Sequence, residues 1–270
     1  MNNTNRPAPF VLISSNHGTM IINRNDYRPS DGCGVGSQIM HKSCYDQNTV
    51  NVLLALLRTR YAAHGKGVVA LDCGANIGVF TIEWAKMMHE WGHVISYEAQ
   101  EKVYYALAGN IVINNCLNVT AKHAAVGSKC GKINIPEPNY LIPSSYGSFE
   151  LKQRENTEFI GQKIDYEANS KSVDMVSIDS LGLERLDFLK IDVEGMEWEV
   201  LQGAKKTIKK CKPMMVIEIL KSDGRQIAEF LVAQGYNVHR LGQMDFFAIH
   251  QSDPSAQRIT MDNGNWKFAL

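Results

Sequence analysis

The sequence has no surplus of charge of either sign. Its 28 Lys and Arg residues are balanced by 28 Asp and Glu residues, so the formal net charge at pH 7 is zero. A nucleic-acid-binding or lipid-surface protein usually carries a basic excess, which this chain lacks. The strongest apolar run, Val52–Leu57, is far shorter than the roughly 18 residues that cross a bilayer. We therefore expect no nucleic-acid partner and no integral membrane segment.

The six cysteines are also too scattered for a familiar cysteine framework. None of them forms a C-x-x-C pair, so they predict reduced thiols rather than a zinc cage or a set of disulfides. The first residues, MNNTNRPAPF, do not resemble a signal peptide, which has a basic segment followed by an apolar one. These features predict a cytoplasmic protein.

From Val68 onward, apolar strand-like runs alternate with helix-spaced patterns, which is typical of βαβ units and a parallel sheet. The predicted strands are Val68–Leu71, Val94–Tyr97, Val119–His123, Phe188–Ile191 and Met214–Ile219. The predicted helices between them are Ile77–Met88, Glu101–Asn114, Gly195–Lys210 and Asp223–Gln234. Tyr236–Leu241 and Asp245–His250 predict a closing antiparallel hairpin around Gly242. The fold class is therefore α/β, with a doubly wound and mostly parallel sheet.

Three segments complete the predicted organisation. Residues 1–66 form an N-terminal extension, expected to be a helical cap with a helix at Thr49–Tyr61, and residues 252–270 form a tail. Within the core of residues 67–251, the stretch 136–171 has little periodicity and several aromatic residues. A segment this long inside a compact domain is usually functional or mobile, so we expect it to cover a ligand, with a plain surface excursion as the alternative.

A glycine-containing turn follows the first predicted strand of the core. The segment LDCGANIG places Asp72, Gly74, Asn76 and Gly78 between a strand and a helix. Glycine lets the backbone turn sharply and approach a ligand, and the helix beyond offers free N–H groups. The next predicted strand ends at Glu98, where a doubly wound fold places an acid on the hydroxyls of a ribose. Together these features predict a site for a nucleotide-like cofactor.

The spacing of this turn separates two classes of cofactor. NAD sites use G-x-G-x-x-G, with the pyrophosphate at the helix N-terminus, whereas this turn is D-x-G-x-N-x-G. The carboxylate of Asp72 is poorly matched to a pyrophosphate but acceptable beside the ammonium and sulfonium groups of S-adenosylmethionine. The turn therefore favours S-adenosylmethionine. An NAD-dependent oxidoreductase, or a turn in which Asp72 is only a cap, remains the alternative.

A second motif stands downstream, in LDFLKIDVEGMEWEVLQGAKK. A predicted strand ends at Asp192, Glu194 and Gly195 turn the chain, and a helix follows. Together with LDCGANIG, YEAQ and HAAVG, this motif resembles the FkbM-type family of class I S-adenosylmethionine-dependent methyltransferases. The resemblance extends from about Val68 to His250. It implies a Rossmann-like, seven-stranded sheet whose last strand is antiparallel, a methyltransferase domain at residues 67–251, and an insertion on the acceptor side at residues 136–171.

The resemblance also implies roles for individual residues. The cofactor would be lined by Asp72, Gly74, Asn76 and Gly78 at its methionine end, Glu98 at the ribose, and Ala124 and Ala125 beside the adenine. Asp192 and Glu194 would lie near the methyl group and the acceptor. Asn110 and Asn114 match paired asparagines of the family, and we assign them no role.

The acidic residues of the second motif have two interpretations. Acids at the start of a helix and lysines at its end complement the helix dipole, and we assign Glu197 and Glu199 to that role. Asp192 precedes the helix at the carboxyl end of a strand, where open α/β sheets bind ligands, so we expect it to be functional. For Glu194 both interpretations stay open. His123 and Glu218, each at the end of a predicted strand, are candidates whose roles in packing or capping are comparably plausible.

These inferences predict an S-adenosylmethionine-dependent O-methyltransferase. An acceptor oxygen would attack the sulfonium methyl group in line, and an alkyl hydroxyl needs help from a general base at neutral pH. Asp192 is the first choice for this catalytic base, with Glu194 or His123 in reserve, and the scheme requires no metal. The resemblance implies a small-molecule or carbohydrate acceptor, such as a sugar, glycolipid, polysaccharide or polyketide hydroxyl. A noncatalytic S-adenosylmethionine-binding protein is the remaining alternative.

Overall fold

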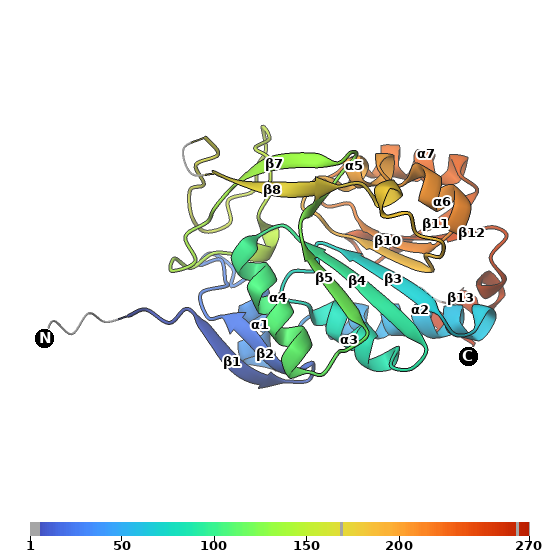
Figure 1. Ribbon diagram of the computed structural model, residues 1–270, viewed down its shortest axis with the longest axis horizontal. Helices are drawn as coiled ribbons and strands as arrows, with labels where there is room; N and C mark the ends of the chain where they lie inside the picture. Colours follow the sequence, from blue (N-terminus) through green and yellow to red (C-terminus); the bar gives the residue numbers. More distant parts are fainter. Residues whose placement is uncertain (1–5, 168–169, 263–264, 270) are drawn as a thin grey trace, which may run out of the picture.

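A seven-stranded sheet forms the centre of the molecule in the computed structural model, which describes residues 6–167, 170–262 and 265–269 (Figure 1). Its strand order is β11-β12-β10-β9-β3-β4-β5. The strands are β3 (Val68–Cys73), β4 (Gly92–Glu98), β5 (Val119–His123), β9 (Phe188–Ile191), β10 (Met214–Glu218), β11 (Tyr236–Leu241) and β12 (Asp245–His250). Only β12 runs antiparallel to both of its neighbours in this sheet. The predicted doubly wound sheet with an antiparallel last strand is confirmed.

Helices cover both faces of this sheet (Figure 1). One face packs against α2 (Gln47–His64), α3 (Val79–Met87) and α4 (Glu101–Ile113), and the other against α5 (Glu197–Gln202), α6 (Lys205–Cys211) and α7 (Gly224–Ala233). Alternate side chains of one strand point to opposite faces, so Val68 and Ala70 join the first core while Leu71 and Cys73 join the second. Burial on both faces explains why the central strands β3, β9 and β10 are mostly apolar.

The helix expected at Gly195–Lys210 is divided into two short helices, α5 and α6. The break lies at Gly203, where an added Cβ would stand 2.2 Å from the backbone oxygen of Gly127. The carboxylate of Asp179 accepts hydrogen bonds from the backbone N–H groups of Lys206 and Thr207, at 3.1 and 2.8 Å. A side chain from another segment therefore caps α6 and starts a new helix there.

The N-terminal extension is only partly the helical cap that was expected. It begins with a hairpin of β1 (Phe10–Ser15) and β2 (Gly18–Asn23), followed by α1 (Val35–Lys42) and α2. Two asparagines, one in α4 and one directly after it, attach this hairpin to the core. Asn110 bonds both the N–H and the carbonyl of Ile21, at 2.5 and 3.1 Å, and Asn114 does the same for Thr19. The paired asparagines therefore have a structural role.

Two smaller pieces flank the main sheet. β6 (Ala125–Val126), β8 (Ser170–Val176) and β7 (Gly131–Pro136) form a three-stranded sheet, and the insertion leaves it between β7 and β8. The tail contains the hairpin of β13 (Ile259–Asp262) and β14 (Asn265–Phe268), whose Trp266 ring packs on Phe247 at 5.3 Å. Residues 1–5 of the extension, 168–169 of the insertion, and 263–264 and 270 of the tail lie outside the described residues.

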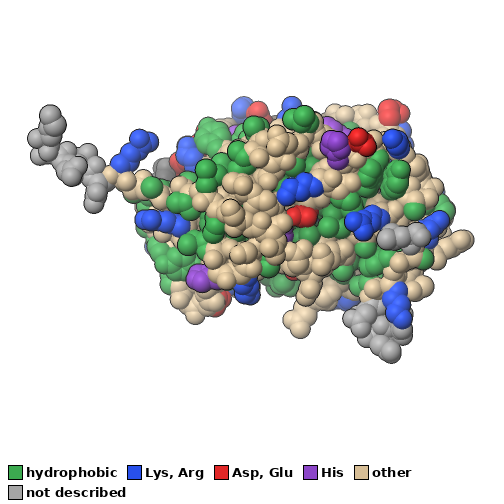
Figure 2. All heavy atoms as spheres, turned by 90° about the horizontal axis from the view of Figure 1, so that it is seen from below, with side chains coloured by type: hydrophobic (Ala, Val, Ile, Leu, Met, Phe, Trp, Pro, Cys, Tyr) green, Lys and Arg blue, Asp and Glu red, His purple; other side chains and the backbone are tan. Residues whose placement is uncertain are grey.

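Lys and Arg side chains on the face turned downward in Figure 1 are scattered among apolar ones and form no continuous basic patch there (Figure 2). In the part of the chain that the structure describes, no helix combines the length and the apolar character needed to cross a membrane.

Candidate active site

A cavity of about 520 Å³ lies at the carboxyl ends of β3, β4, β9 and β10. Its lining includes seven of the residues expected at the site: Gly74, Asn76, Glu98, Ala124, Ala125, Asp192 and Glu194. These residues come from four separate strand ends, and the parallel sheet brings those ends to one edge. The N-terminal segment and the insertion supply the remaining walls.

The glycine turn brings the backbone of β3 directly against the end of β9. Gly74 has a φ of +80°, and a Cβ at this position would lie 1.8 Å from the backbone oxygen of Asp192. The N–H groups of Gly74 and Ala75 both donate to the carbonyl of Tyr97, at 3.0 and 2.9 Å. Only glycine fits this combination of a left-handed φ and a close backbone contact. The turn is therefore held in place from two neighbouring strands.

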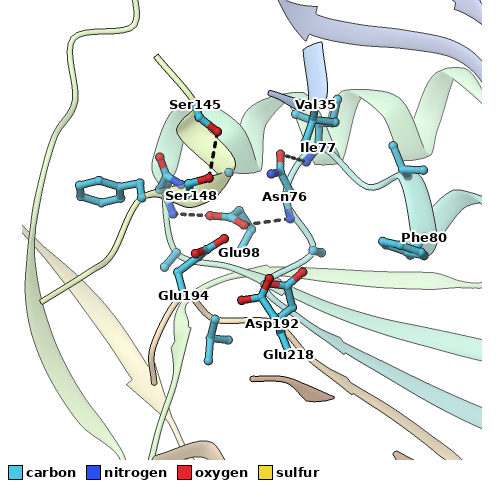
Figure 3. Close-up of a pocket in the computed structure, with 18 of the residues that line it drawn as sticks. Val35, Asn76, Ile77, Phe80, Glu98, Ser145, Ser148, Asp192, Glu194 and Glu218 are labelled. Atoms are coloured by element: carbon cyan, nitrogen blue, oxygen red, sulfur yellow. Dashed lines mark hydrogen bonds between the residues drawn. The ribbon is translucent and has the colours of Figure 1, made fainter. Parts of the chain in front are cut away.

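Glu98 faces the cavity from the end of β4 (Figure 3). Its two carboxylate oxygens accept hydrogen bonds from the backbone N–H groups of Asn76 and Gln100, at 2.9 and 2.7 Å. The residue is 6% exposed, and this burial raises the pKa of Glu98 to about 7, against the lowering effect of the backbone hydrogen bonds. Each oxygen keeps a second lone pair, so the carboxylate suits a ligand with two neighbouring hydroxyls.

Two residues expected to line the cofactor do not line the cavity. Asp72 is fully buried beneath the turn, where it accepts a hydrogen bond from Thr81 Oγ1 at 2.8 Å and lies 3.7 Å from Lys190 Nζ. Gly78 has a φ of +93°, and a Cβ there would meet Leu107 of α4 at 2.5 Å. Asp72 therefore lies beneath the turn and does not face the cavity, and Gly78 allows α4 to pack closely. Both positions agree with the alternative in which Asp72 is only a cap of the turn.

Three carboxyl groups, from Asp192, Glu194 and Glu218, meet at the other side of the cavity (Figure 3). One oxygen from each lies within 4.8 Å of the others. Lys190 Nζ lies 2.8 Å from Asp192 Oδ2, and Lys221 Nζ lies 2.5 Å from Glu194 Oε2. The protein thus supplies two ammonium groups of its own to this cluster, and we assign no metal to it.

The charge of this cluster is still incompletely balanced. Burial first, and the neighbouring charge of Asp192 second, raise the pKa of Glu194 to about 8 and that of Glu218 to about 9. Glu218 Oε2 is buried, and the described residues offer it no hydrogen-bond partner. Asp192 and Glu194 each have a lysine partner, whereas Glu218 has none, so the cluster combines carboxyls in different electrostatic surroundings and is suited to proton transfer.

The loop that carries Glu194 is built on two left-handed residues, with φ values of +55° at Glu194 and +96° at Gly195. Glu197 is fully buried beneath this loop and accepts hydrogen bonds from the N–H groups of Val193 and Gly195, at 3.1 and 3.0 Å. The expectation that Glu197 is a surface charge is therefore wrong, because it holds the loop in shape. Glu199 is partly exposed and pairs with Lys152 at 3.5 Å, which agrees with a surface role.

His123 lies outside the lining of the cavity. Its Nε2 atom is 3.0 Å from the carbonyl oxygen of Ala99, and its ring stacks on Tyr104 at 5.3 Å. These contacts are those of a packed rim histidine, so we no longer consider His123 as a base.

Sequence reasoning missed several lining residues. The cavity is also lined by Tyr45 of the N-terminal segment and by Ser145 and Ser148 of the insertion. Lys221, which follows β10, pairs with Glu194. No motif marked them, because each reaches the site from a distant segment through folding. Lys190 stands in the K-I-D-V-E-G motif. Its position two residues before Asp192 on the same strand could have identified it as a residue of the site.

Comparisons with known proteins give a consistent result. The model of the FkbM methyltransferase domain matches residues 72–238, well over half of the chain. The chain is 28% identical to methyltransferase sdnD of Sordaria araneosa over 192 residues, which cover 63% of this chain and 74% of that protein. It is 25% identical to methyltransferase 1 of Beauveria bassiana over 146 residues, which cover 49% of this chain and 57% of that protein.

Among solved structures, the chain is similar to that of methyltransferase FkbM from Methylobacillus flagellatus KT, with 15% identity and a TM-score of 0.49. The match covers 76% of this chain and 56% of that one. The chain therefore spans little more than half the length of this protein and of the Beauveria relative.

Proposed function

The chain belongs to the FkbM methyltransferase family, and from this premise we propose that it transfers a methyl group from S-adenosylmethionine to a hydroxyl oxygen of a sugar, glycolipid, polysaccharide or polyketide-like acceptor. The family makes it an S-adenosylmethionine-dependent methyltransferase. The hydroxyl acceptor and the roles of individual residues are our proposal.

The observation that carries this proposal is the direct contact between the cofactor turn and the acidic cluster. A Cβ on Gly74 would lie 1.8 Å from the carbonyl oxygen of Asp192, so the two parts of the site are adjacent through their backbones. A ligand on the turn therefore has its reactive end next to the Asp192 carboxylate. This juxtaposition is what a methyl transfer to a nearby hydroxyl requires.

The cavity fits S-adenosylmethionine at two points. Gly74 lines the cavity at the turn, and Glu98 presents a buried carboxylate suited to the two ribose hydroxyls. Ala124 and Ala125 line the wall assigned to the adenine. When bound, S-adenosylmethionine supplies an electrophilic methyl group. The oxidoreductase alternative is not supported, because the family of this chain is one of methyltransferases.

The chain's own residues then have three tasks. Lys190 holds Asp192 through Oδ2 at 2.8 Å, which leaves Oδ1 to receive the proton of the acceptor hydroxyl. General-base help of this kind contributes typically 10²–10⁴-fold. Glu194 and Glu218, whose pKa values burial raises, stand beside Asp192 and can share a proton with it. The insertion and the N-terminal segment form walls of the cavity and shield the reacting groups from water.

The test uses isotope-labelled S-adenosylmethionine, the purified protein, and extracts of cells that lack the gene. We expect release of S-adenosylhomocysteine and a labelled product that is heavier by one methylene group. The product should survive mild alkali, because a methyl ether is stable there whereas a methyl ester is hydrolysed. Asp192→Asn should suppress labelling, with Glu199→Gln as the control. An alkali-labile label or an N-methyl product would contradict O-methylation of a hydroxyl, and cofactor binding without any turnover would favour a noncatalytic role.

A further inference from the structure

The middle of the insertion lies against the cofactor turn. Residues 145–149, here called the covering turn, contain the 3₁₀ helix η1 (Tyr146–Ser148) and line the cavity through Ser145, Gly147, Ser148 and Phe149. A Cβ on Gly147 would lie 2.9 Å from Asn76 Nδ2, and Gln100 Nε2 donates to the carbonyl of Tyr146 at 3.0 Å.

These two contacts share a feature. Asn76 and Gln100 are the residues whose backbone N–H groups hold the two oxygens of Glu98. The covering turn therefore touches both supports of the carboxylate assigned to the ribose. Within the covering turn, the Ser145 hydroxyl lies 2.9 Å from that of Ser148 (Figure 3).

One end of the covering turn is pinned by a buried carboxylate. Asp26, which follows β2, is only 4% exposed. Its Oδ1 accepts from the N–H of Tyr146 at 3.0 Å, and its Oδ2 accepts from the N–H of Gly36 at 2.9 Å. A single side chain thus ties the covering turn to the start of α1. Both donors are backbone groups, so this carboxylate holds the backbone of the turn directly, in addition to the hydrogen bond from the Tyr146 hydroxyl to the carbonyl of Ile142 at 2.6 Å.

The other end is tethered by a lysine. Lys221 Nζ donates to the carbonyl of Ser148 at 2.7 Å and pairs with Glu158 Oε2 at 2.8 Å. Glu158 is in turn paired with Arg28 of the N-terminal segment. Asp26 and Lys221 thus hold the covering turn near its two ends, beside a backbone hydrogen bond from Ser145 to Ile160 at 2.7 Å, and the turn belongs to neither neighbouring sheet.

From these contacts we propose that the covering turn is a wall of the S-adenosylmethionine site, packed over the ribose opposite Glu98, and that Asp26 is the positioning residue that keeps it closed. The inference rests on the cofactor of the proposed function and not on its acceptor. It assigns a cofactor role to a part of the insertion that the sequence linked only to the acceptor.

The test measures binding of S-adenosylhomocysteine to the full chain and its dissociation rate by stopped flow. Asp26→Asn keeps the shape but replaces one carboxylate oxygen by an NH2 group, which cannot accept a hydrogen bond from a backbone N–H. A lost hydrogen bond to a charged group weakens an interaction by roughly ten- to a hundredfold, so we expect dissociation to become at least about tenfold faster. Hydrogen exchange at residues 145–149 should be protected by the ligand in the wild type and much less in the variant.

Asp174→Asn is the control. Asp174 belongs to β8, is absent from the cavity lining, and has a side chain that is 68% exposed and paired with Lys132. Its dissociation rate should match that of the wild type. If Asp26→Asn does not fold, Lys221→Met removes the opposite anchor and should also accelerate dissociation.

Three outcomes would overturn the proposal, and the third is distinguishable from the first two. If wild type binds the ligand but folded Asp26→Asn and Lys221→Met release it at the wild-type rate, the covering turn is no part of the cofactor site. The same conclusion follows if the ligand leaves exchange at residues 145–149 unchanged. If the wild type does not bind S-adenosylhomocysteine at all, the cofactor assignment fails first, and the proposal fails with it.

Discussion

An aspartate stands at each end of β9, and the two differ in burial and in the number of their charged partners. Asp187 immediately precedes the strand and Asp192 immediately follows it. Asp187 is 1% exposed and is paired with Arg60 at 3.1 Å and Arg185 at 2.7 Å, while one of its oxygens also accepts from the N–H of Val69 at 2.9 Å. Asp192 is 32% exposed and has one ammonium partner, Lys190.

Their surroundings differ more than the residues themselves. At the amino end, Arg60 is shared by two buried acids, Asp187 and Asp253, so positive and negative groups alternate. At the carboxyl end, Asp192 meets Glu194 and Glu218, whose pKa values burial raises. A buried charge that is fully paired serves stability, whereas an excess of one sign stores unfavourable energy that a site can use. The two ends of β9 therefore differ in charge balance: the buried acids at the amino end are paired with arginines, whereas acidic groups are in excess at the carboxyl end.

The largest expected effect lies at the amino end. Asp187→Ala would leave two guanidinium groups and the N–H of Val69 without this partner, and breaking a buried pair costs about 3–5 kcal/mol. Urea denaturation should show this loss of unfolding free energy. The control is Asp174→Ala, whose ion pair with Lys132 is 68% exposed and should change stability by at most about 0.5 kcal/mol. A similar loss of unfolding free energy in both variants would show that the buried ion pairs of Asp187 stabilise the protein no more than an exposed pair does.

At the carboxyl end the expected effect is on catalysis. Asp192→Asn should lower kcat by about 10²-fold while the affinity for S-adenosylhomocysteine stays within a few-fold, because a base acts only as the methyl group moves. Turnover at saturating cofactor and equilibrium titration separate these quantities. Near-normal kcat in this variant would remove Asp192 as the base and make Glu194→Gln the next test.

Glu98 should show the reverse pattern. Glu98→Ala removes the acceptor of the ribose hydroxyls in ground and transition states alike, so cofactor affinity should fall about ten- to a hundredfold. Titration calorimetry with S-adenosylhomocysteine measures this. Glu101→Ala is the neighbouring control, since Glu101 pairs with the lysines 102 and 171 at 3.0 and 2.9 Å and is absent from the cavity lining. Equal losses in the two variants would show that the effect is not specific to the ribose site.

The smallest expected effect is a gain in stability at the acidic cluster. The folded state raises the pKa of Glu218 from 4.5 to about 9, so the folded chain keeps a proton that the unfolded chain releases. Stability from this group is full below pH 4.5 and is lost as the pH rises toward 9. Glu218→Gln mimics the protonated form and should stabilise the protein at pH 7, where ionisation of the unfolded glutamate favours unfolding.

Denaturation curves at pH 4 and pH 8 check the sign of this effect, because the advantage of the Glu218→Gln variant should be absent at the lower pH and grow at the higher one. If the difference in unfolding free energy between the variant and the wild type is the same at both pH values, Glu218 has an ordinary pKa in the folded protein.

Much of the fold could be predicted because its signals are local. β5, β9, β11 and β12 begin and end where the sequence predicts, since apolar runs bounded by turn residues depend on near neighbours. The same holds for Gly74, whose φ of +80° belongs to its own turn. The prediction failed for α5 and α6, where the Asp179 side chain caps the second helix from 27 positions away, and for the hairpin of β1 and β2.

The sequence by itself determined the sheet, the cofactor turn and the acidic residues of the second motif, because each is encoded by residues a few positions apart. Only the tertiary structure decided how charges are shared. Arg60 and Asp187 are 127 positions apart, and Asp26 and Tyr146 are 120 apart. Electrostatic partners act through space and burial, which no linear spacing records. For that reason the sequence predicted Asp192 and Glu98, but not the buried Glu197 or the Asp26 anchor.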